Sequence, residues 1–257
     1  MTTTITATPE PAATPPRVRL DVTSDQASVV LWRVAQDGSK VKVRTSDGGP
    51  LVVSGGTAFL YDPEPPQGQQ LYYTADGTAV TPSATVTVDS GLVWLVNPLV
   101  PARSVPVRIA NISDRMAGAG SQSIRYPIGA KYPIVANDGA RKADTYTLTV
   151  RTVGQQEYDA LDALLADLST LLLNIPASKR WIGVQTEYIA VGDIPRQNPT
   201  SWGQFQHRNW PLPCTVTASP AGGSQANITY GYSKALYATY ADRKAAAATY
   251  GQAFDPE

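Results

Sequence analysis

The chain has 257 residues, among them 21 Pro and 20 Gly, so long uninterrupted helices must be rare and an all-helical fold is excluded. Lys plus Arg equals Asp plus Glu at 21 each, and charged residues are only 16% of the chain, so nucleic-acid binding is not expected as a main task. Hydrophobic residues at 42%, with 13 Tyr and 5 Trp, suffice for a packed core, which excludes a wholly disordered chain.

Residues 1–16 are mostly Thr, Pro and Ala and carry almost no large apolar side chain. Such a segment buries too little surface to offset the entropy of ordering, so we predict a flexible arm, either free or ordered against a neighbouring subunit. No basic segment followed by an apolar one stands at the start, and no apolar run reaches about 18 residues anywhere, so neither a secretory signal nor a membrane anchor is expected.

From Arg17 onward, apolar and polar residues alternate, which is typical of strands with one buried face. The alternating apolar positions are Val18, Leu20, Val22, Val29, Leu31, Val41 and Val43. Further strand-like runs cover residues 58–61, 70–74, 85–89 and 92–96, with Gly-, Asp- and Pro-rich turns between the strands. So many short strands within roughly 80 residues predict a β-sandwich over residues 17–98.

Three features of this segment resemble a fibronectin type III-like domain. They are Trp32 on an early strand, Tyr61-Asp62 before a Pro-rich turn that ends at Gly68, and the strand of residues 71–74. The resemblance implies that Trp32 and Tyr61 lie in the core of the sandwich. A fold of this kind does not by itself define a function.

A second domain is predicted over residues 99–222. Strand-like runs cover residues 105–109, 124–128, 132–135, 171–176, 188–194 and 210–216. The strongest run, residues 145–151, places Tyr146, Leu148 and Val150 on one face. Together with one helix these runs predict an α+β, split-barrel-like sheet, so the whole chain is expected to be mainly β.

The helix is predicted at about residues 155–170, directly after the strongest strand. Its apolar stripe consists of Tyr158, Leu161, Leu164, Leu165 and Leu168. Thr152 and Gln155 have the spacing of a capping box. Packing onto its own sheet is expected for the stripe, with docking of a partner helix as the alternative.

Residues 223–257 are predicted to form an Ala- and Tyr-rich C-terminal extension with a short helical part. The run Ala238-Thr239-Tyr240-Ala241-Asp242 recurs ten residues later as Ala248-Thr249-Tyr250-Gly251-Gln252, on either side of a helix-favouring stretch.

Residues that commonly act as catalytic groups or metal ligands are scarce in the sequence. A single His207 and a single Cys214 leave no complete nucleophile–base set and no metal site, so we predict no enzyme activity, no cofactor and no metal. Asp62, Glu64 and Asp193 could act as paired carboxylates on a glycoside, but each is interpreted as a turn residue. Residues 118–121 contain a G-x-G without the rest of a phosphate-binding loop and are interpreted as a flexible loop.

Aromatic residues gather in the segment around Trp202, Phe205 and Trp210. Trp and Tyr are common at contact surfaces, so these side chains could stack on a sugar or on another subunit. Packing within the core or at strand ends is the alternative for the same residues.

The order of these segments resembles the minor tail proteins of long-tailed actinobacterial phages. The resemblance rests on the sandwich, residues 94–103, the leucine-rich helix, residues 188–193, Trp210-Pro211-Leu212-Pro213 and the Thr-Tyr-Ala-Asp ending. Within that group the second domain is similar to the ring-forming domain of distal tail proteins, although many of those begin with the ring domain, whereas here the sandwich comes first.

This resemblance implies a structural protein of the virion tail tip, assembled in the host cytoplasm as a ring, with a hexamer as the expected order. Its implied partners are further copies of itself, the tail tube protein, the tail-tip hub and the tape-measure protein, and a host cell-surface glycan for the displayed sandwich. The alternative function is a carbohydrate-binding or adhesin-type β-sandwich module.

Overall fold

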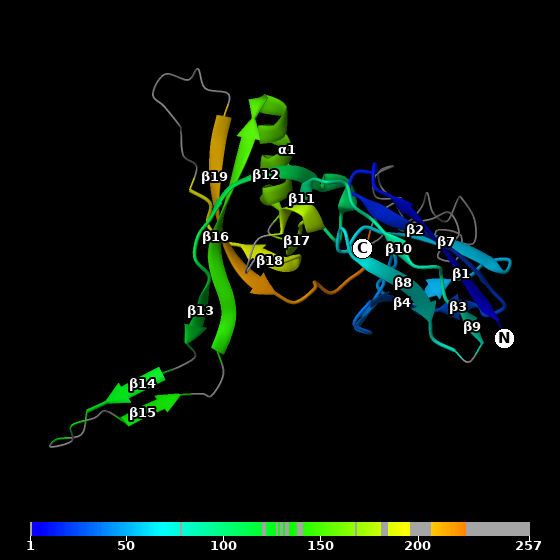
Figure 1. Ribbon diagram of the computed structural model, residues 1–257, viewed down its shortest axis with the longest axis horizontal. Coiled ribbons are helices and arrows are strands. Elements are labelled where there is room, and N and C mark those ends of the chain that lie inside the picture. The colour runs from blue at the N-terminus through cyan, green and yellow to red at the C-terminus, as the bar shows by residue number, and fades with distance from the viewer. Residues whose placement is uncertain are drawn as a thin grey trace, which may run out of the picture. The chain divides into compact units, whose positions relative to one another are not determined.

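The computed structural model describes residues 2–77, 79–119, 122–126, 128, 131, 134–137, 141–167, 169–180, 185–195 and 207–224. As predicted, the fold is mainly β, and the described residues contain one α-helix. The chain divides into two compact units, whose elements are labelled in Figure 1. The first unit comprises Met1–Val107, Leu171–Thr186 and Ser219–Glu257, and the second comprises Arg108–Thr170 and Glu187–Ala218.

Two four-stranded sheets form the β-sandwich of the first unit, with strand orders β7-β2-β1-β9 and β10-β8-β4-β5. The first sheet consists of β1 (Thr3–Glu10), β2 (Arg17–Ser24), β7 (Thr57–Asp62) and β9 (Val80–Thr81). The second consists of β4 (Leu31–Ala35), β5 (Lys40–Lys42), β8 (Gln70–Ala75) and β10 (Val86–Thr87). A small separate pair joins β3 (Ser28–Val29) to β6 (Leu51–Val52).

The core of the sandwich follows the alternation in the sequence. Both sheets contribute buried side chains, and these include Val18, Leu20, Val22, Leu31, Leu60, Leu71 and Tyr73. Residues at every second position of β2 therefore point inward, as the period of two predicts. Val41 is the exception, because it lies on the outermost strand of its sheet and is 44% exposed.

The predicted flexible arm is wrong for residues 3–10. These residues form β1, which pairs antiparallel with β2 from Thr3 opposite Ser24 to Glu10 opposite Arg17. Thr3 and Ile5 are buried, and Thr3 Oγ1 lies 2.8 Å from Ser24 Oγ. The unbroken run of β-branched residues from Thr2 to Thr6 was the strand signal here, but the segment has so little apolar surface that it was interpreted as flexible.

The expected core position of Trp32 is also wrong. Trp32 lies on β4 but is only half-buried, and its indole Nε1 donates a hydrogen bond to Asp76 Oδ1 at 2.8 Å. Its neighbours Leu31 and Arg33 are buried instead. The side chains of successive strand residues point to opposite faces, and Leu31 occupies the inner face.

A seven-stranded sheet has the order β12-β11-β17-β18-β19-β16-β13, and an additional pairing of β12 with β16 closes six of its strands into a barrel. Its strands are β11 (Val93–Val96), β12 (Val105–Ile112), β13 (Met116–Ala119), β16 (Arg141–Val153), β17 (Leu171–Asn174), β18 (Glu187–Val191) and β19 (His207–Thr217). Because β11 pairs with β12 and β17, the predicted domain boundary at residue 98 falls inside this sheet.

The strongest predicted strand is confirmed and longer than expected. On β16, Tyr146, Leu148 and Val150 are buried, as the alternation predicts. The strand pairs antiparallel with β19 over its C-terminal part, from Thr145 opposite Thr215 to Val153 opposite His207.

The helix α1 (Gly154–Ala166) follows β16 directly and packs against it. Leu161 and Leu164 are buried, which confirms the predicted stripe at these positions, whereas Leu165 is half-buried and Leu168 lies outside the described residues. The predicted capping box is wrong. Val153 is the N-cap residue, and its backbone N donates to Glu157 Oε2 at 2.7 Å.

The remaining described elements are short. They are the 3-10 helices η1 (Pro101–Arg103) and η2 (Ala177–Lys179), and the antiparallel hairpin of β14 (Gln122–Arg125) and β15 (Ile134–Asn137). Gly118 and Ala119 lie on β13 rather than in the predicted loop, while Gly120 and Ser121 are outside the described residues. The predicted C-terminal extension, residues 223–257, with its helical part also lies outside the described residues, except for Gly223 and Ser224 at its start.

Candidate functional site

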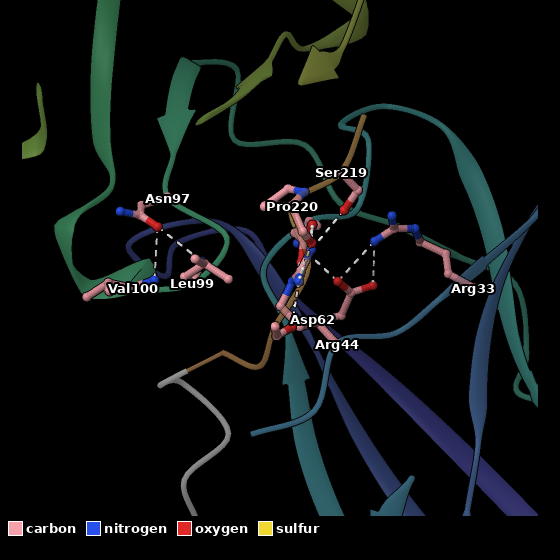
Figure 2. A network of polar contacts seen from close by, with 10 residues as sticks. Arg33, Arg44, Asp62, Asn97, Leu99, Val100, Ser219 and Pro220 are labelled. Atoms are coloured by element: carbon pink, nitrogen blue, oxygen red, sulfur yellow. Dashed lines mark hydrogen bonds and ion pairs between the residues drawn. The ribbon is translucent and has the colours of Figure 1, made fainter. Parts of the chain in front are cut away.

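A buried ion pair lies between the two sheets of the sandwich. Arg33 Nη1 on β4 donates to both carboxylate oxygens of Asp62 on β7, at 3.0 and 2.8 Å (Figure 2). Tyr73 OH donates to the same carboxylate at 3.0 Å, and the backbone N of Glu64 donates to Asp62 Oδ1 at 3.0 Å. Both carboxylate oxygens of Asp62 therefore accept hydrogen bonds from neighbouring groups. Burial, with the Asp62 charge as a second cause, raises the pKa of Tyr73 well above its usual value.

A second buried ion pair, between Arg44 and Glu64, binds the segment that follows β19. Arg44 Nε donates to Glu64 Oε1 at 2.8 Å. The same guanidinium donates to Pro220 O at 2.8 Å, to Gly222 O at 2.7 Å and to Ser219 Oγ at 2.8 Å (Figure 2). We call Arg44, Glu64 and residues 219–224 the clamp, because one guanidinium fixes this returning segment at three acceptors.

The clamp also brings two backbones close together. Ser224 N donates to Thr45 O at 2.7 Å. A Cβ at Gly223 would overlap the backbone of Ser46, so a residue with a side chain cannot occupy this position without displacing the segment. Close by, Asn97 Oδ1 accepts from the backbone N atoms of Leu99 and Val100, each at 3.0 Å, which fixes the turn after β11 (Figure 2).

Gly223→Ala should lower the free energy of unfolding by about 1–3 kcal/mol, the usual cost of overpacking a close contact. A Cβ at Gly192 meets only ordinary van der Waals neighbours, so Gly192→Ala is the matched control and should leave stability almost unchanged. Chemical denaturation of both variants measures the difference. Equal stability of the two variants would contradict the close approach at Gly223.

A second polar cluster fixes the Pro-rich loop of the sandwich onto β17. Asn174 Nδ2 donates to Pro65 O at 2.9 Å, and its Oδ1 accepts from Gln67 N at 3.1 Å. Gln67 Nε2 donates to Leu92 O, and Arg180 Nη2 donates to Gln67 O, both at 2.9 Å. The first unit thus contains two buried polar clusters, one around Asp62 and Glu64 and one around Asn174.

In the second unit, Glu187 on β18 is the centre of a third cluster. Arg115 Nη2 donates to both oxygens of Glu187, at 2.8 and 2.6 Å, and Tyr146 OH donates to Oε1 at 2.9 Å. Burial raises the pKa of Tyr146, and the Glu187 charge adds to this effect. The tyrosine therefore stays a neutral donor that holds β16 to β18.

The single histidine and the single cysteine have different environments. His207 is exposed at the start of β19. Cys214 is buried on the same strand, its Sγ lies 3.3 Å from Leu212 O, and burial raises the pKa of the thiol to about 12. The two residues stand seven positions apart on one extended strand, which is too far for a nucleophile and its base.

The carboxylates and aromatic residues considered in the sequence have different environments. Asp62 and Glu64 are each paired with a buried arginine, and Asp193 is exposed. Trp210 is buried, its ring centroid lies 4.8 Å from that of Tyr158, and its Nε1 donates to Thr152 Oγ1. Trp202 and Phe205 lie outside the described residues.

Two observations concern metals and membranes. Within the described part of the chain, no three His, Cys, Asp or Glu side chains come together in a group that could hold a metal ion. None of the helices described there combines the length and the apolar character needed to cross a bilayer.

Exposed strand edges are the remaining feature with chemical consequence. β13 pairs with β16 and ends the seven-stranded sheet, and β14 and β15 pair with each other as a separate two-stranded sheet. Met116 on β13 is 68% exposed, Tyr126 beside the hairpin is 75% exposed, and Ile128 is fully exposed. Strand edges that no described strand covers, next to exposed apolar side chains, are suited to pairing with another chain.

The sequence analysis missed the buried arginines. Arg33 follows Leu31 by two residues and Arg44 lies next to Val43, so a charge at or near inward positions was the available signal for the two arginines. In comparisons with known proteins, neither the family models nor the curated proteins contain a match to this chain.

Proposed function

We propose that the chain is a structural subunit of a phage tail tip, which assembles with copies of itself into a ring and displays the β-sandwich. The observation that carries the proposal is that the strands described by the structure pair with only one side of β13, β14 and β15, with Met116, Tyr126 and Ile128 exposed beside them. An isolated two-stranded hairpin is only marginally stable in water, so a third strand from a neighbouring subunit would stabilise it.

The sequence resemblance supports the same function. The strand orders of the two sandwich sheets are compatible with a fibronectin type III-like domain, and the barrel with its single helix is compatible with a ring-forming tail domain. Head-to-tail pairing of unlike edges gives closed rings when the rotation between subunits closes, and the resemblance suggests a hexamer. The tail tube, hub and tape-measure proteins would be the further partners in the virion.

The alternative of a carbohydrate-binding or adhesin-type module has less support. It drew on Trp202, Phe205 and Trp210 as exposed stacking residues, and Trp210 is buried against Tyr158. No other described feature favours a sugar over a protein partner.

Met116→Lys combined with Tyr126→Lys should abolish self-assembly and leave the fold intact, because two charges at an apolar strand edge oppose pairing. Native mass spectrometry and electron microscopy of the full chain should show rings for the wild type and monomers for the double variant. Val52→Lys is the control, since Val52 is exposed on β6 of the sandwich. A monomeric wild type at high concentration, or rings of the double variant, would refute the proposal.

A further inference from the structure

The barrel sheet has a two-stranded extension at β13. Residues 141–144 of β16 pair with β13, whereas the described pairing of β16 with β19 begins at Thr145. We call β13 and residues 141–144 the ribbon. Met116, Arg141 and Lys142 are exposed on it. Two strands alone bury little of their own surface, so packing against a helix would stabilise the ribbon.

The ribbon and the hairpin that follows β13 have an excess of positive charge. From Met116 to Ala143 the sequence has four basic residues and one acidic residue, namely Arg125, Lys131, Arg141, Lys142 and Asp138. Next along β16, the carboxylate of Asp144 lies 3.5 Å from Arg115. A surface that packs on the ribbon should therefore present carboxylates to Arg141 and Lys142.

The helix α1 of the same unit has the opposite charge. From Gly154 to Ala166 it contains three acidic residues and no basic residue. Arg108 Nη2 lies 3.0 Å from Glu157 Oε1 in the first turn. The other two carboxylates, Asp159 and Asp162, lie further along the helix.

These carboxylates lie on the outer face of α1. Asp159, Asp162, Ala163 and Ala166 have the spacing i, i+3, i+4 and i+7, which places them on one side of the helix. Asp159 and both alanines are exposed, Asp162 is half-buried, and the buried leucines of the stripe lie on the opposite side. We call these four residues the acidic face. Its small alanine side chains allow another backbone to approach closely.

The ribbon and the acidic face of one copy lie near opposite ends of β16. Figure 1 shows β13 beside the N-terminal part of this strand and α1 beside its C-terminal part. The strand advances about 3.3 Å per residue, so Lys142 and Val153 are separated by roughly 36 Å. The two surfaces are therefore too far apart to bind each other within one copy.

We infer that the ribbon of one copy docks on the acidic face of α1 in the next copy, with Arg141 and Lys142 beside Asp159 and Asp162. A head-to-tail contact joins two different surfaces, and these two have opposite charge and occur once in every chain. The inference rests on the proposed ring and names the two surfaces that meet in it.

Charge reversal of each surface in the full chain tests the contact. Asp159→Lys with Asp162→Lys reverses the helix, and Arg141→Glu with Lys142→Glu reverses the ribbon. Each variant alone should lose the rings that the wild type forms, because like charges would meet. An equal mixture of the two variants should form rings again, with both chains in equal numbers, because every helix then meets a ribbon of opposite charge. Native mass spectrometry gives this composition, and circular dichroism checks that each variant is folded.

Lys40→Glu with Lys42→Glu is the matched control, because it makes the same change of charge on exposed β5 of the sandwich and should leave the rings intact. Raising NaCl from about 0.1 to 1 M shortens the screening length from about 10 to 3 Å and should dissociate wild-type rings. Rings of either reversed variant alone, a monomeric mixture of folded variants, or wild-type rings that do not respond to salt would overturn this inference and leave the proposed ring standing. A wild type that forms no rings would refute the proposed function as well.

Discussion

Replacing Arg33 with Met should lower the free energy of unfolding by about 3–5 kcal/mol, because Asp62 would stay buried without its counter-charge. The side chains of Arg33 and Asp62 are only 10% and 2% exposed, so water cannot take the place of the guanidinium. Tyr73 OH and the backbone N of Glu64 would be the remaining donors to Asp62. Denaturant-induced unfolding of the full chain measures the loss.

An exposed ion pair on the same sandwich is the matched control for this prediction. Arg19 Nη2 lies 2.8 Å from Asp21 Oδ1, and both side chains are 44% exposed. Arg19→Met should leave the melting midpoint unchanged, because solvent screens this pair. Adding Asp62→Asn to Arg33→Met should restore part of the lost stability, since it removes the unpaired charge. Similar losses for Arg33→Met and Arg19→Met would show that burial does not set the strength of the buried pair.

Leu164→Ala is expected to destabilise the protein by about 2–5 kcal/mol. Leu164 is fully buried on α1, which packs against β16, so the substitution leaves a cavity as well as losing apolar burial. Leu92→Ala makes the same chemical change at a side chain that is 48% exposed, and a much smaller loss is expected there. Thermal unfolding of both variants gives the comparison. An unchanged midpoint for Leu164→Ala would contradict the packing of the stripe.

The periodic spacing of apolar residues in the sequence was enough to predict much of the fold. The alternation of Val18, Leu20 and Val22 predicted their burial on β2, and that of Tyr146, Leu148 and Val150 did the same on β16. Helical spacing predicted the burial of Leu161 and Leu164. Such patterns succeed because each strand or helix buries one face, and the spacing of apolar residues records that face.

The candidate site was less predictable, because its partners are far apart along the chain. The sequence drew attention to Asp62 and Glu64 as turn residues, and the bond from Glu64 N to Asp62 Oδ1 is of that kind. It did not indicate that Arg33 and Arg44 neutralise them, since each pair joins different elements of the sandwich. Which strand ends the barrel sheet was likewise undefined, because the outer position of β13 in the described sheet exists only after the other strands have paired.

The sequence by itself determined a mainly β protein with one amphipathic helix, and it determined which positions of its strongest strands are buried. Tertiary structure alone decided that residues 3–10 form β1, that Trp32 points away from the core, and that β11 belongs to the barrel sheet. Local alternation specifies the two faces of a strand but not its neighbours. Neighbours are chosen by backbone pairing and core packing across long stretches of chain, and those interactions also left Val41 exposed at its edge and buried Arg33 against Asp62.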